Sequence, residues 1–269
     1  MPKKKLGQNF LIDKNIGEKI IRFSPLTSES DVIEIGAGFG VMTSILAEKC
    51  GIIYAVEKDP RIYEIMVPFF SEHKNIVFIK GDILEVDINS LAKGKKDLFV
   101  FGNIPYYIST PIITRIIDNR KHIKSAYIVM QEDLADRIVS LPGSKVYGSL
   151  SCFVQFFTKV KKLLRIKRNS FYPKPKVESC LIELKMLDEP SVRVKDAELM
   201  FNIIRKAFSQ RRKKAINPLS NNKFLTLERT DWEKIFKECD IDFAARAEKL
   251  SISDYARLAD TVGEVVKEK

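Results

Sequence analysis

The chain has 269 residues, 45% of them hydrophobic and 30% charged, which is typical of a soluble globular protein with one large domain and room for a smaller one. No run approaches the roughly 20 apolar residues of a membrane span, and the basic N-terminus lacks the features of a signal peptide. A cytoplasmic protein without a membrane partner is therefore expected. The net charge of +11 and the pI of about 9.3 predict an acidic partner such as nucleic acid.

Short apolar segments separated by helix-like stretches run through the first half of the chain. Five of them predict strands: 31–38, 51–59, 75–82, 97–103 and 125–131. They are almost continuously hydrophobic, as parallel strands covered on both faces must be. Segments 41–50 and 110–120 have apolar residues at helical spacing, which indicates βαβ units and a doubly wound, Rossmann-like α/β sheet. Two further strands, at 161–168 and 179–187, bring the expected number to about seven.

The pattern changes near residue 188, after which the chain is typical of helices. Three are expected, over 197–216, 230–240 and 251–268. Thr230 and Glu233 fit a capping box well, whereas Ser251 and Asp254 fit one only approximately. We therefore predict a first domain over residues 1–187 and a small all-helical domain over 188–269.

Positive charge is concentrated in two runs, 159–168 and 205–214. Residues 187–269 hold 17 Lys and Arg against 15 Asp and Glu, a net charge of +2, so residues 1–186 carry the other +9. A single charged run is often only a solvated face. With the overall excess of positive charge, RNA or DNA contact becomes the favoured interpretation. The candidate contact residues are Arg165, Arg168, Arg211, Arg212, Lys213 and Lys214.

The first expected strand ends in the glycine-rich sequence EIGAGFG, residues 34–40. Glycines at positions such as Gly36 and Gly38 allow a tight turn that a ligand can approach closely. Glu57 ends the second strand, about 20 residues after Gly36, where an acidic side chain can bind ribose hydroxyls. Asp82 ends the third strand and is placed to meet an adenine edge. Either acid could also be a solvated strand end.

The ligand suggested by this turn is S-adenosylmethionine rather than a dinucleotide. The spacing is G-x-G-x-G, not the G-x-G-x-x-G of dinucleotide sites. Glu34 would repel a pyrophosphate but suits a ligand that carries an ammonium group. S-adenosylmethionine has an adenine, a ribose and an ammonium, and no phosphate.

The fourth strand ends in Asn103, Ile104, Pro105 and Tyr106. An exocyclic base amine is a poor nucleophile while its lone pair is delocalised into the ring. The Asn103 oxygen and the Ile104 carbonyl can accept its two hydrogens, with Pro105 fixing the turn. Tyr106 offers a ring on which the base can stack. Alternatively, Asn103 only caps a turn and Tyr106 is a core residue.

Metal chemistry and cysteine nucleophiles have little support in this sequence. The four cysteines lie far apart with no C-x-x-C pair, and there are only two histidines. No metal is expected.

The chain resembles the small-subunit (16S) rRNA adenine dimethyltransferases of the KsgA type. The matching stretches are LGQNFLID (6–13), EIGAGFG (34–40), AVEKD (55–59), GD (81–82), FGNIPYYIST (101–110), MQEDLADRI (130–138), FYPKPKVES (171–179), AFSQRRKKAINPL (207–219) and IDFAARAEKLSISDYARLAD (241–260). They cover nearly the whole chain and are far more specific than a generic methyltransferase signature.

The resemblance implies an S-adenosylmethionine-dependent enzyme that dimethylates two adjacent adenosines near the 3′ end of small-subunit rRNA, in ribosome biogenesis. It also implies a seven-stranded methyltransferase domain and a small helical C-terminal domain that binds the subunit. A monomer is expected, although the sequence says almost nothing about oligomeric state. The cofactor positions carried over are Asn9, Leu11, Gly36, Glu57, Asp82 and Asn103. Phe171 would stack on the target adenine opposite Tyr106. Tyr107, where many relatives have asparagine, has no assigned role.

Two alternatives remain open. The large-subunit rRNA adenine methyltransferases that confer macrolide resistance share the cofactor turn and the Asn-x-Pro-Tyr motif, although the C-terminal motifs favour the small-subunit family. A ribosome-assembly or transcription factor that kept the fold and lost catalysis is the second. The intact residues Gly36, Glu57, Asp82 and Asn103 argue against that loss.

Overall fold

The computed structural model describes residues 9–94, 97–221 and 225–268; the side chains of Tyr106 and Glu268 lie outside this description. The chain forms two compact units. The sheet unit comprises Met1–Ala135 and Lys159–Met186, and the helical unit comprises Asp136–Thr158 and Leu187–Lys269. Within the described ranges, no helix combines the length and hydrophobicity needed to cross a membrane.

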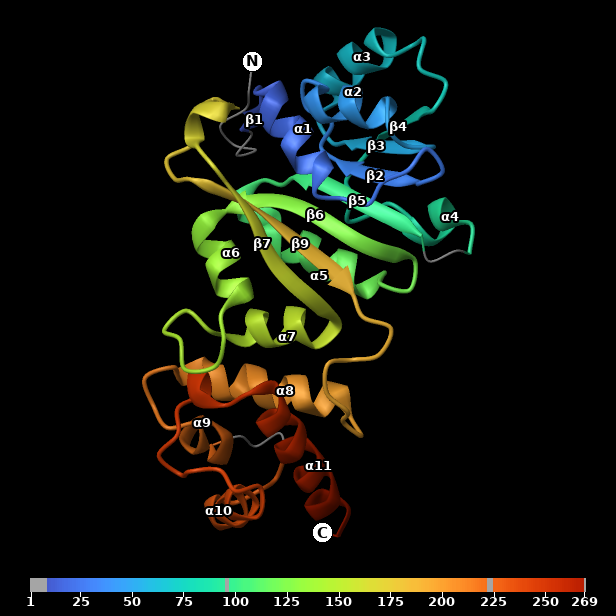
Figure 1. Ribbon diagram of the computed structural model, residues 1–269. Coiled ribbons are helices and arrows are strands. Elements are labelled where there is room, and N and C mark those ends of the chain that lie inside the picture. The colour runs from blue at the N-terminus through green and yellow to red at the C-terminus, as the bar shows by residue number, and fades with distance from the viewer. Residues whose placement is uncertain (1–8, 95–96, 222–224, 269) are drawn as a thin grey trace. The chain divides into compact units, whose positions relative to one another are not determined.

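A seven-stranded sheet forms the centre of the sheet unit, in the order β4-β3-β2-β5-β6-β9-β7 (Figure 1). The strands are β2 (Val32–Ile35), β3 (Ile53–Glu57), β4 (Ile76–Lys80), β5 (Leu98–Asn103), β6 (Ile123–Gln131), β7 (Thr158–Ile166) and β9 (Ser179–Met186). Strands β2 to β6 pair in parallel, and β9 pairs antiparallel to β6. Every residue of β2 and β3 is buried, as their continuous hydrophobicity predicted. The seven expected strands are thus confirmed.

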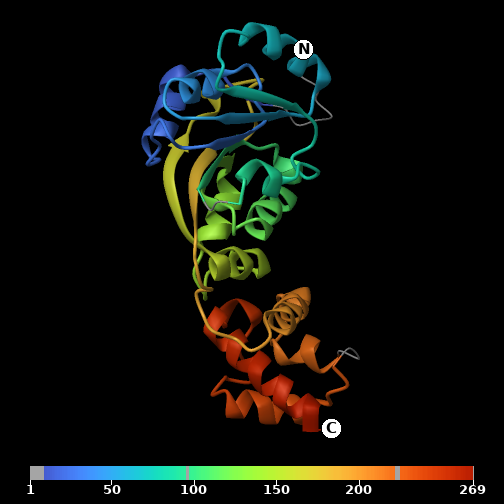
Figure 2. The ribbon, with the colours of Figure 1, turned by 90° about the vertical axis from the view of Figure 1, so that its right-hand side faces the viewer.

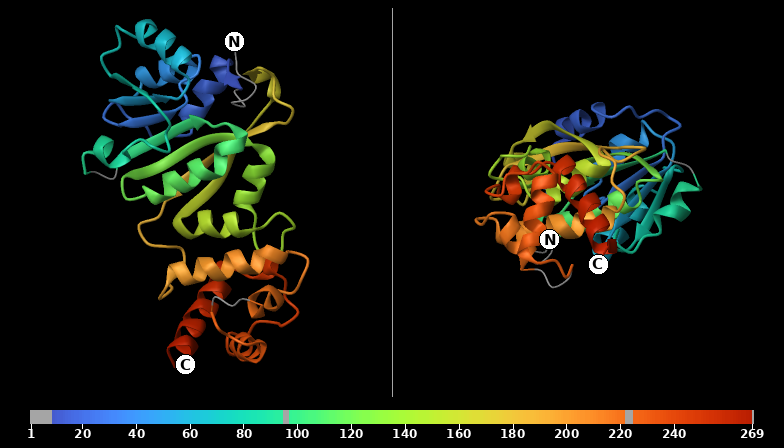
Figure 3. Two further views of the ribbon diagram at one scale, coloured as in Figure 1. Left: turned by 180° about the vertical axis from the view of Figure 1, so that it is seen from behind. Right: turned by 90° about the horizontal axis from the view of Figure 1, so that it is seen from below.

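Helices flank this sheet, as the view from behind also shows (Figure 3). They are α1 (Lys14–Arg22), α2 (Val41–Ala47), α3 (Pro60–Phe69), α4 (Ile88–Ala92), α5 (Ser109–Asp118) and α6 (Glu132–Val139), with short 3₁₀ turns η2 (Tyr106–Ile108) and η3 (Arg168–Ser170). A two-stranded ribbon joins β1 (Phe10–Leu11) to β8 (Phe171–Tyr172). It pairs Phe10 with Tyr172 and Leu11 with Phe171, and so brings the N-terminal segment beside one that comes much later in the chain.

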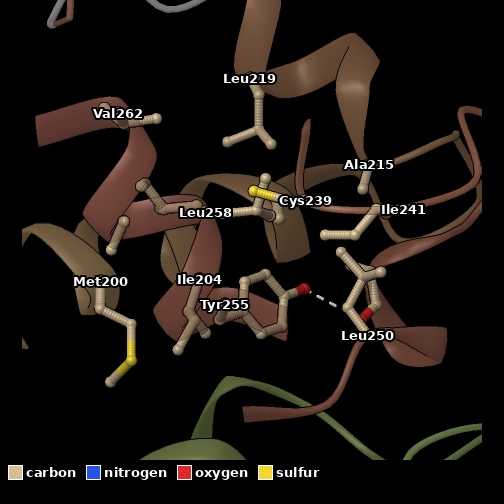
Figure 4. Packing of buried hydrophobic residues seen from close by; sticks show 14 of the residues in the cluster. Met200, Ile204, Ala215, Leu219, Cys239, Ile241, Leu250, Tyr255, Leu258 and Val262 are labelled. Atoms are coloured by element: carbon tan, nitrogen blue, oxygen red, sulfur yellow. Dashed lines mark hydrogen bonds between the residues drawn. The ribbon is translucent and has the colours of Figure 1, made fainter. Parts of the chain in front are cut away.

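The helical unit contains α7 (Ser149–Phe157), α8 (Ala197–Ala207), α9 (Ile216–Ser220), α10 (Arg229–Glu238) and α11 (Ile252–Glu268), with 3₁₀ turns η4 (Phe208–Gln210) and η5 (Ala247–Lys249) (Figure 2). Its core is apolar, and Figure 4 shows Ile204 beside the Tyr255 ring and Leu219 pointing toward Cys239. The Tyr255 hydroxyl, although fully buried, donates to the Ala247 carbonyl at 2.9 Å. The bond satisfies the single polar group of that side chain inside the core.

Residues 136–158 cluster with the helical unit, whereas the sequence placed them in the first domain. Tyr147, Cys152 and Phe156 are buried in the helical core. Arg211 also donates to the carbonyls of Lys145 and Tyr147, both at 2.8 Å. These contacts join positions that are far apart in the sequence. The last boundary between the two units, between Met186 and Leu187, lies next to the predicted domain boundary.

Two predictions about helix ends in this unit are wrong. The helix expected over 197–216 ends at Ala207, and the basic residues from Arg211 onward lie in a turn before α9. Helix α10 is capped by Glu228 with Asp231, ahead of the predicted Thr230 box. The box judged approximate is present, since the Ser251 backbone N–H donates to Asp254 at 2.7 Å and the Asp254 N–H donates to the Ser251 hydroxyl at 3.1 Å.

Candidate active site

A pocket opens at the carboxyl ends of β2, β3 and β5 and beside the turn that follows β4. Four of the residues predicted at successive strand ends line it: Gly36, Glu57, Asp82 and Asn103. Asn9 and Leu11 from the N-terminal segment line it too. The carboxyl edge of a parallel sheet is where open α/β folds bind ligands. The structure therefore brings the predicted cofactor positions together in one pocket.

The glycine-rich turn between β2 and α2 is left-handed at three positions. Gly36, Gly38 and Gly40 have φ values of 77°, 54° and 77°. A Cβ at Gly36 would meet no atom within 4 Å, whereas one at Gly38 would lie 2.9 Å from the Phe10 ring. Gly36 thus leaves its backbone open to the pocket, and Gly38 allows the N-terminal segment to approach.

Glu57 is buried and held by backbone donors. The Gly38 N–H donates to one carboxylate oxygen at 3.2 Å, and the Asp59 N–H donates to the other at 2.8 Å. Burial raises the pKa of Glu57 above its ordinary value, against these hydrogen bonds, which lower it. The carboxylate is fixed in one orientation and can accept further hydrogen bonds from a ligand.

Asp82 is paired with Lys58, which follows Glu57 at the end of β3. The Lys58 ammonium donates to Asp82 Oδ2 at 2.5 Å, and the Leu84 N–H donates to Oδ1 at 3.1 Å. Burial pulls the pKa of Asp82 upward, but the hydrogen bond and the charge of Lys58 outweigh it, so the pKa is lowered. Asp82 is therefore an ionised acceptor at this end of the pocket.

Glu34 lines the pocket from within β2 and is only 2% exposed. The Thr43 hydroxyl donates to it at 2.7 Å. Burial, with a smaller contribution from the nearby Glu57, raises its pKa to about 8 against the Thr43 hydrogen bond, which lowers it. A cationic ligand group beside Glu34 would offset this loss of hydration.

Asn103, the last residue of β5, is oriented by the N-terminal segment. Its side-chain nitrogen donates to the Asn9 carbonyl at 2.6 Å. The side-chain oxygen of Asn103 accepts no hydrogen bond from the described part of the chain. The turn after Asn103 is held by backbone hydrogen bonds. The Ile104 N–H donates to the Val129 carbonyl at 3.1 Å, and the Ile108 N–H donates to the Pro105 carbonyl at 3.2 Å. The Asn103 amide is thus held through its nitrogen, and its oxygen accepts no hydrogen bond from the described residues.

Comparisons with known proteins identify the family of this chain. Residues 2–264 match the family described as ribosomal RNA adenine dimethylase. The chain belongs to the ribosomal RNA adenine dimethylase family. Relatives named ribosomal RNA small subunit methyltransferase A include one from Clostridium botulinum, 38% identical, and one from Geobacillus sp., 37% identical. Each alignment covers 98% of this chain, and 94% and 92% of the two relatives.

Solved structures show that the fold is shared with rRNA adenine dimethylases and related enzymes. A dimethyladenosine transferase from Plasmodium falciparum has a TM-score of 0.79 at 24% identity, covering 93% of this chain and 95% of that one. The 23S rRNA methyltransferase ErmE has a TM-score of 0.71 at 22% identity, covering 95% and 100%. At these identities the likeness concerns the fold alone.

Of the two aromatic residues predicted to stack on the target base of this dimethylase-family chain, only Phe171 has a described side chain. Phe171 is only 3% exposed, does not line the pocket and packs in the core cluster with Leu11 and Phe101. Its ring cannot stack on a ligand unless β8 shifts. The Tyr106 side chain lies outside the described residues, although its backbone opens the 3₁₀ turn η2.

The predicted RNA contacts of this family member are divided between the two units. In the sheet unit, Arg165 pairs with Glu132 at 3.0 Å, and Arg168 lies 4.0 Å from Glu178. In the helical unit, the guanidinium of Arg211 is occupied by backbone carbonyls. Arg212, Lys213 and Lys214 are exposed. Arg211 therefore has a structural role that its charge alone did not reveal.

Several pocket residues escaped the sequence reasoning. Phe10 and Phe39 both line the pocket, with ring centroids 4.4 Å apart. Lys58 directly follows Glu57 in the motif AVEKD, a signal that could have been used. Thr43 lies inside α2, and nothing in its local sequence marks it as a partner of Glu34. Among the residues described, no cluster of three or more His, Cys, Asp or Glu side chains suits a metal.

Proposed function

We propose that this protein uses S-adenosylmethionine to dimethylate the exocyclic amines of two adjacent adenosines near the 3′ end of small-subunit rRNA. The observation that carries the proposal is the Asn103 amide, held by the Asn9 carbonyl at the pocket with its oxygen unused by the described residues. Membership of the rRNA adenine dimethylase family supports the reaction class. The relatives named for the small subunit support the choice of subunit over the large-subunit alternative.

The pocket residues fit S-adenosylmethionine. Glu57 suits the ribose hydroxyls, Asp82 suits the adenine amine, and buried Glu34 suits the ammonium group of the amino-acid end. The open space at Gly36 allows a ligand to lie against the backbone. Asn9, Leu11 and Gly38 complete the proposed cofactor contacts. The cofactor, when bound, supplies an electrophilic methyl group.

The end of β5 can activate the nucleophile without a general base. The Asn103 oxygen and the Ile104 carbonyl would accept the two amine hydrogens and favour the pyramidal, nucleophilic form. Pro105 sets the direction of the turn, with φ of −61°. Transfer makes the nitrogen proton acidic, so it can leave to solvent. The monomethylated amine keeps one hydrogen, which one of these two oxygens can still accept, and a second molecule of the cofactor would supply the second methyl group.

The target adenosine must leave its stack to reach this pocket. We propose that it stacks on Tyr106, and that Phe171 becomes its second face after β8 shifts. A fluorescent adenine analogue at the target position should brighten on binding. Unchanged fluorescence would argue against unstacking.

We propose that RNA affinity comes from basic side chains in both units. The protein is proposed to act as a monomer in the cytoplasm. Arg165, Arg168, Arg212 and Lys213 are exposed and suited to phosphate contacts. Replacing Arg212 and Lys213 by alanine should weaken subunit binding and flatten its salt dependence. Arg211 is left intact in this variant because it holds two carbonyls.

The decisive experiment combines labelled S-adenosylmethionine with unmethylated small or large subunits and maps the labelled adenosines. Wild type should label two adjacent adenosines of the small subunit. Asn103→Ala should lose at least about 100-fold in rate while retaining RNA affinity. Asn89→Ala, at an exposed position in the same unit, is the matched control. Label on the large subunit would favour the other methyltransferase family, and no label would favour a binding protein.

A further inference from the structure

Tyr107 is a pocket residue to which the proposed chemistry gives no role. It lines the pocket, and its side chain is 59% exposed. Its backbone is fixed, because Ile108 N–H and the Ser109 hydroxyl donate to the Pro105 carbonyl at 3.2 and 3.0 Å. The turn therefore presents an exposed aromatic ring from a rigid base.

Tyr107 shares this pocket with Lys58 and Asp82. Tyr107 follows β5, whereas Lys58 and Asp82 follow β3 and β4, on the other side of β2. Strands β5 and β3 are two places apart in the sheet, which is about 10 Å. Even so, the Tyr107 phenol influences Lys58: the Asp82 hydrogen bond is the main cause of the raised pKa of Lys58, and Tyr107 adds to it. Tyr107 and the Lys58–Asp82 pair therefore border the same pocket from different strands.

We propose that Tyr107 closes the adenine end of the pocket, its ring covering the face of the adenine whose edge meets Asp82. This inference rests on the proposed use of S-adenosylmethionine. Ile83 and Ile108 also line this pocket and give it an apolar wall. An adenine between that wall and the Tyr107 ring would be enclosed on both faces. Stacking on an aromatic ring strengthens base binding by about tenfold or more.

The Tyr107 ring could instead stack on a base of the RNA substrate, so the binding of cofactor and the binding of RNA must be measured separately. We expect Tyr107→Ala to weaken S-adenosylhomocysteine binding at least tenfold by calorimetry in the absence of RNA. Tyr107→Phe keeps the ring and should remain within about threefold of wild type. Tyr172→Ala is the matched control, since Tyr172 is 56% exposed in the same unit and does not line the pocket.

A second measurement uses the wild-type protein alone. Tetranitromethane should nitrate both Tyr107 and Tyr172, and mass spectrometry can follow each peptide. Saturating S-adenosylhomocysteine should slow nitration of Tyr107 at least fivefold and leave Tyr172 unchanged.

The outcomes separate the two proposals. If wild type and Tyr107→Ala bind S-adenosylhomocysteine equally well, and the ligand does not protect Tyr107 of wild type from nitration, the role of Tyr107 is overturned and the proposed function is not. Wild type that does not bind S-adenosylhomocysteine would refute the proposed function, and the role of Tyr107 with it.

Discussion

Replacing Glu34 by glutamine should change how the stability of the ligand-free protein depends on pH. Burial is the main reason that the pKa of Glu34 rises from 4.5 to about 8. The folded state therefore holds this proton more tightly than the unfolded state. Its stabilising effect is complete below pH 4.5 and is lost as the pH rises toward 8. Glutamine is neutral throughout and can still accept the Thr43 hydroxyl.

The magnitude follows from the size of the shift. Each pKa unit corresponds to about 1.4 kcal/mol, so wild type should lose about 5 kcal/mol across the whole window and about 3 kcal/mol of it by pH 7. Relative to Glu34→Gln, the free energy of unfolding of wild type should fall by about 1.4 kcal/mol per pH unit between pH 5 and 8.

Urea unfolding of both proteins at pH 5, 6, 7 and 8, followed by circular dichroism, measures this difference. Glu72→Gln, at an exposed position in the same unit, is the control and should follow wild type. If Glu34→Gln and wild type lose stability in parallel over this range, Glu34 is not protonated in the folded protein and the reasoning fails.

Three further substitutions test other features. Gly36→Ala should leave the free energy of unfolding within about 1–2 kcal/mol of wild type but weaken cofactor binding, because its methyl group enters open space in the pocket. Thermal unfolding measures the first effect, and calorimetry of cofactor binding measures the second. Gly40→Ala should be far less stable, since its Cβ would collide with the Phe70 ring at 2.7 Å, and normal melting would contradict this. Tyr255→Phe should cost about 0.5–1.5 kcal/mol, because the Ala247 carbonyl loses the hydroxyl donor and keeps only the Leu250 N–H at 3.3 Å. Urea unfolding followed by the fluorescence of the single tryptophan measures this loss, and an unchanged midpoint would refute it.

Local pattern was enough to predict the sheet and much of the pocket. The strands are continuous apolar runs, and parallel strands place their carboxyl ends at one edge. Gly36, Glu57, Asp82 and Asn103 could therefore be assigned to one site from their positions at strand ends, and all four line it. The position of Asn9 came only from family resemblance, since its contact with Asn103 joins two distant parts of the chain.

What the sequence did not reveal depends on tertiary contacts or on competition between neighbouring residues. Glu228 and Thr230 are both able to begin α10, and the reciprocal bonds with Asp231 favour the first. The basic run was expected to continue a helix, but Arg211 instead holds carbonyls from a distant part of the sequence. Burial of Phe171 follows from its place in a short ribbon strand that periodicity cannot reveal.

The discontinuous helical unit constrains how this family can be recombined. A chimera that exchanged only the C-terminal segment from Leu187 onward would separate Arg211 from the carbonyls of Lys145 and Tyr147, and Tyr147 from its own core. An exchange of the helical unit between relatives would have to transplant Asp136–Thr158 together with that segment. This unit is thus encoded by two separate stretches of the gene, and recombination at a single crossover would disrupt it.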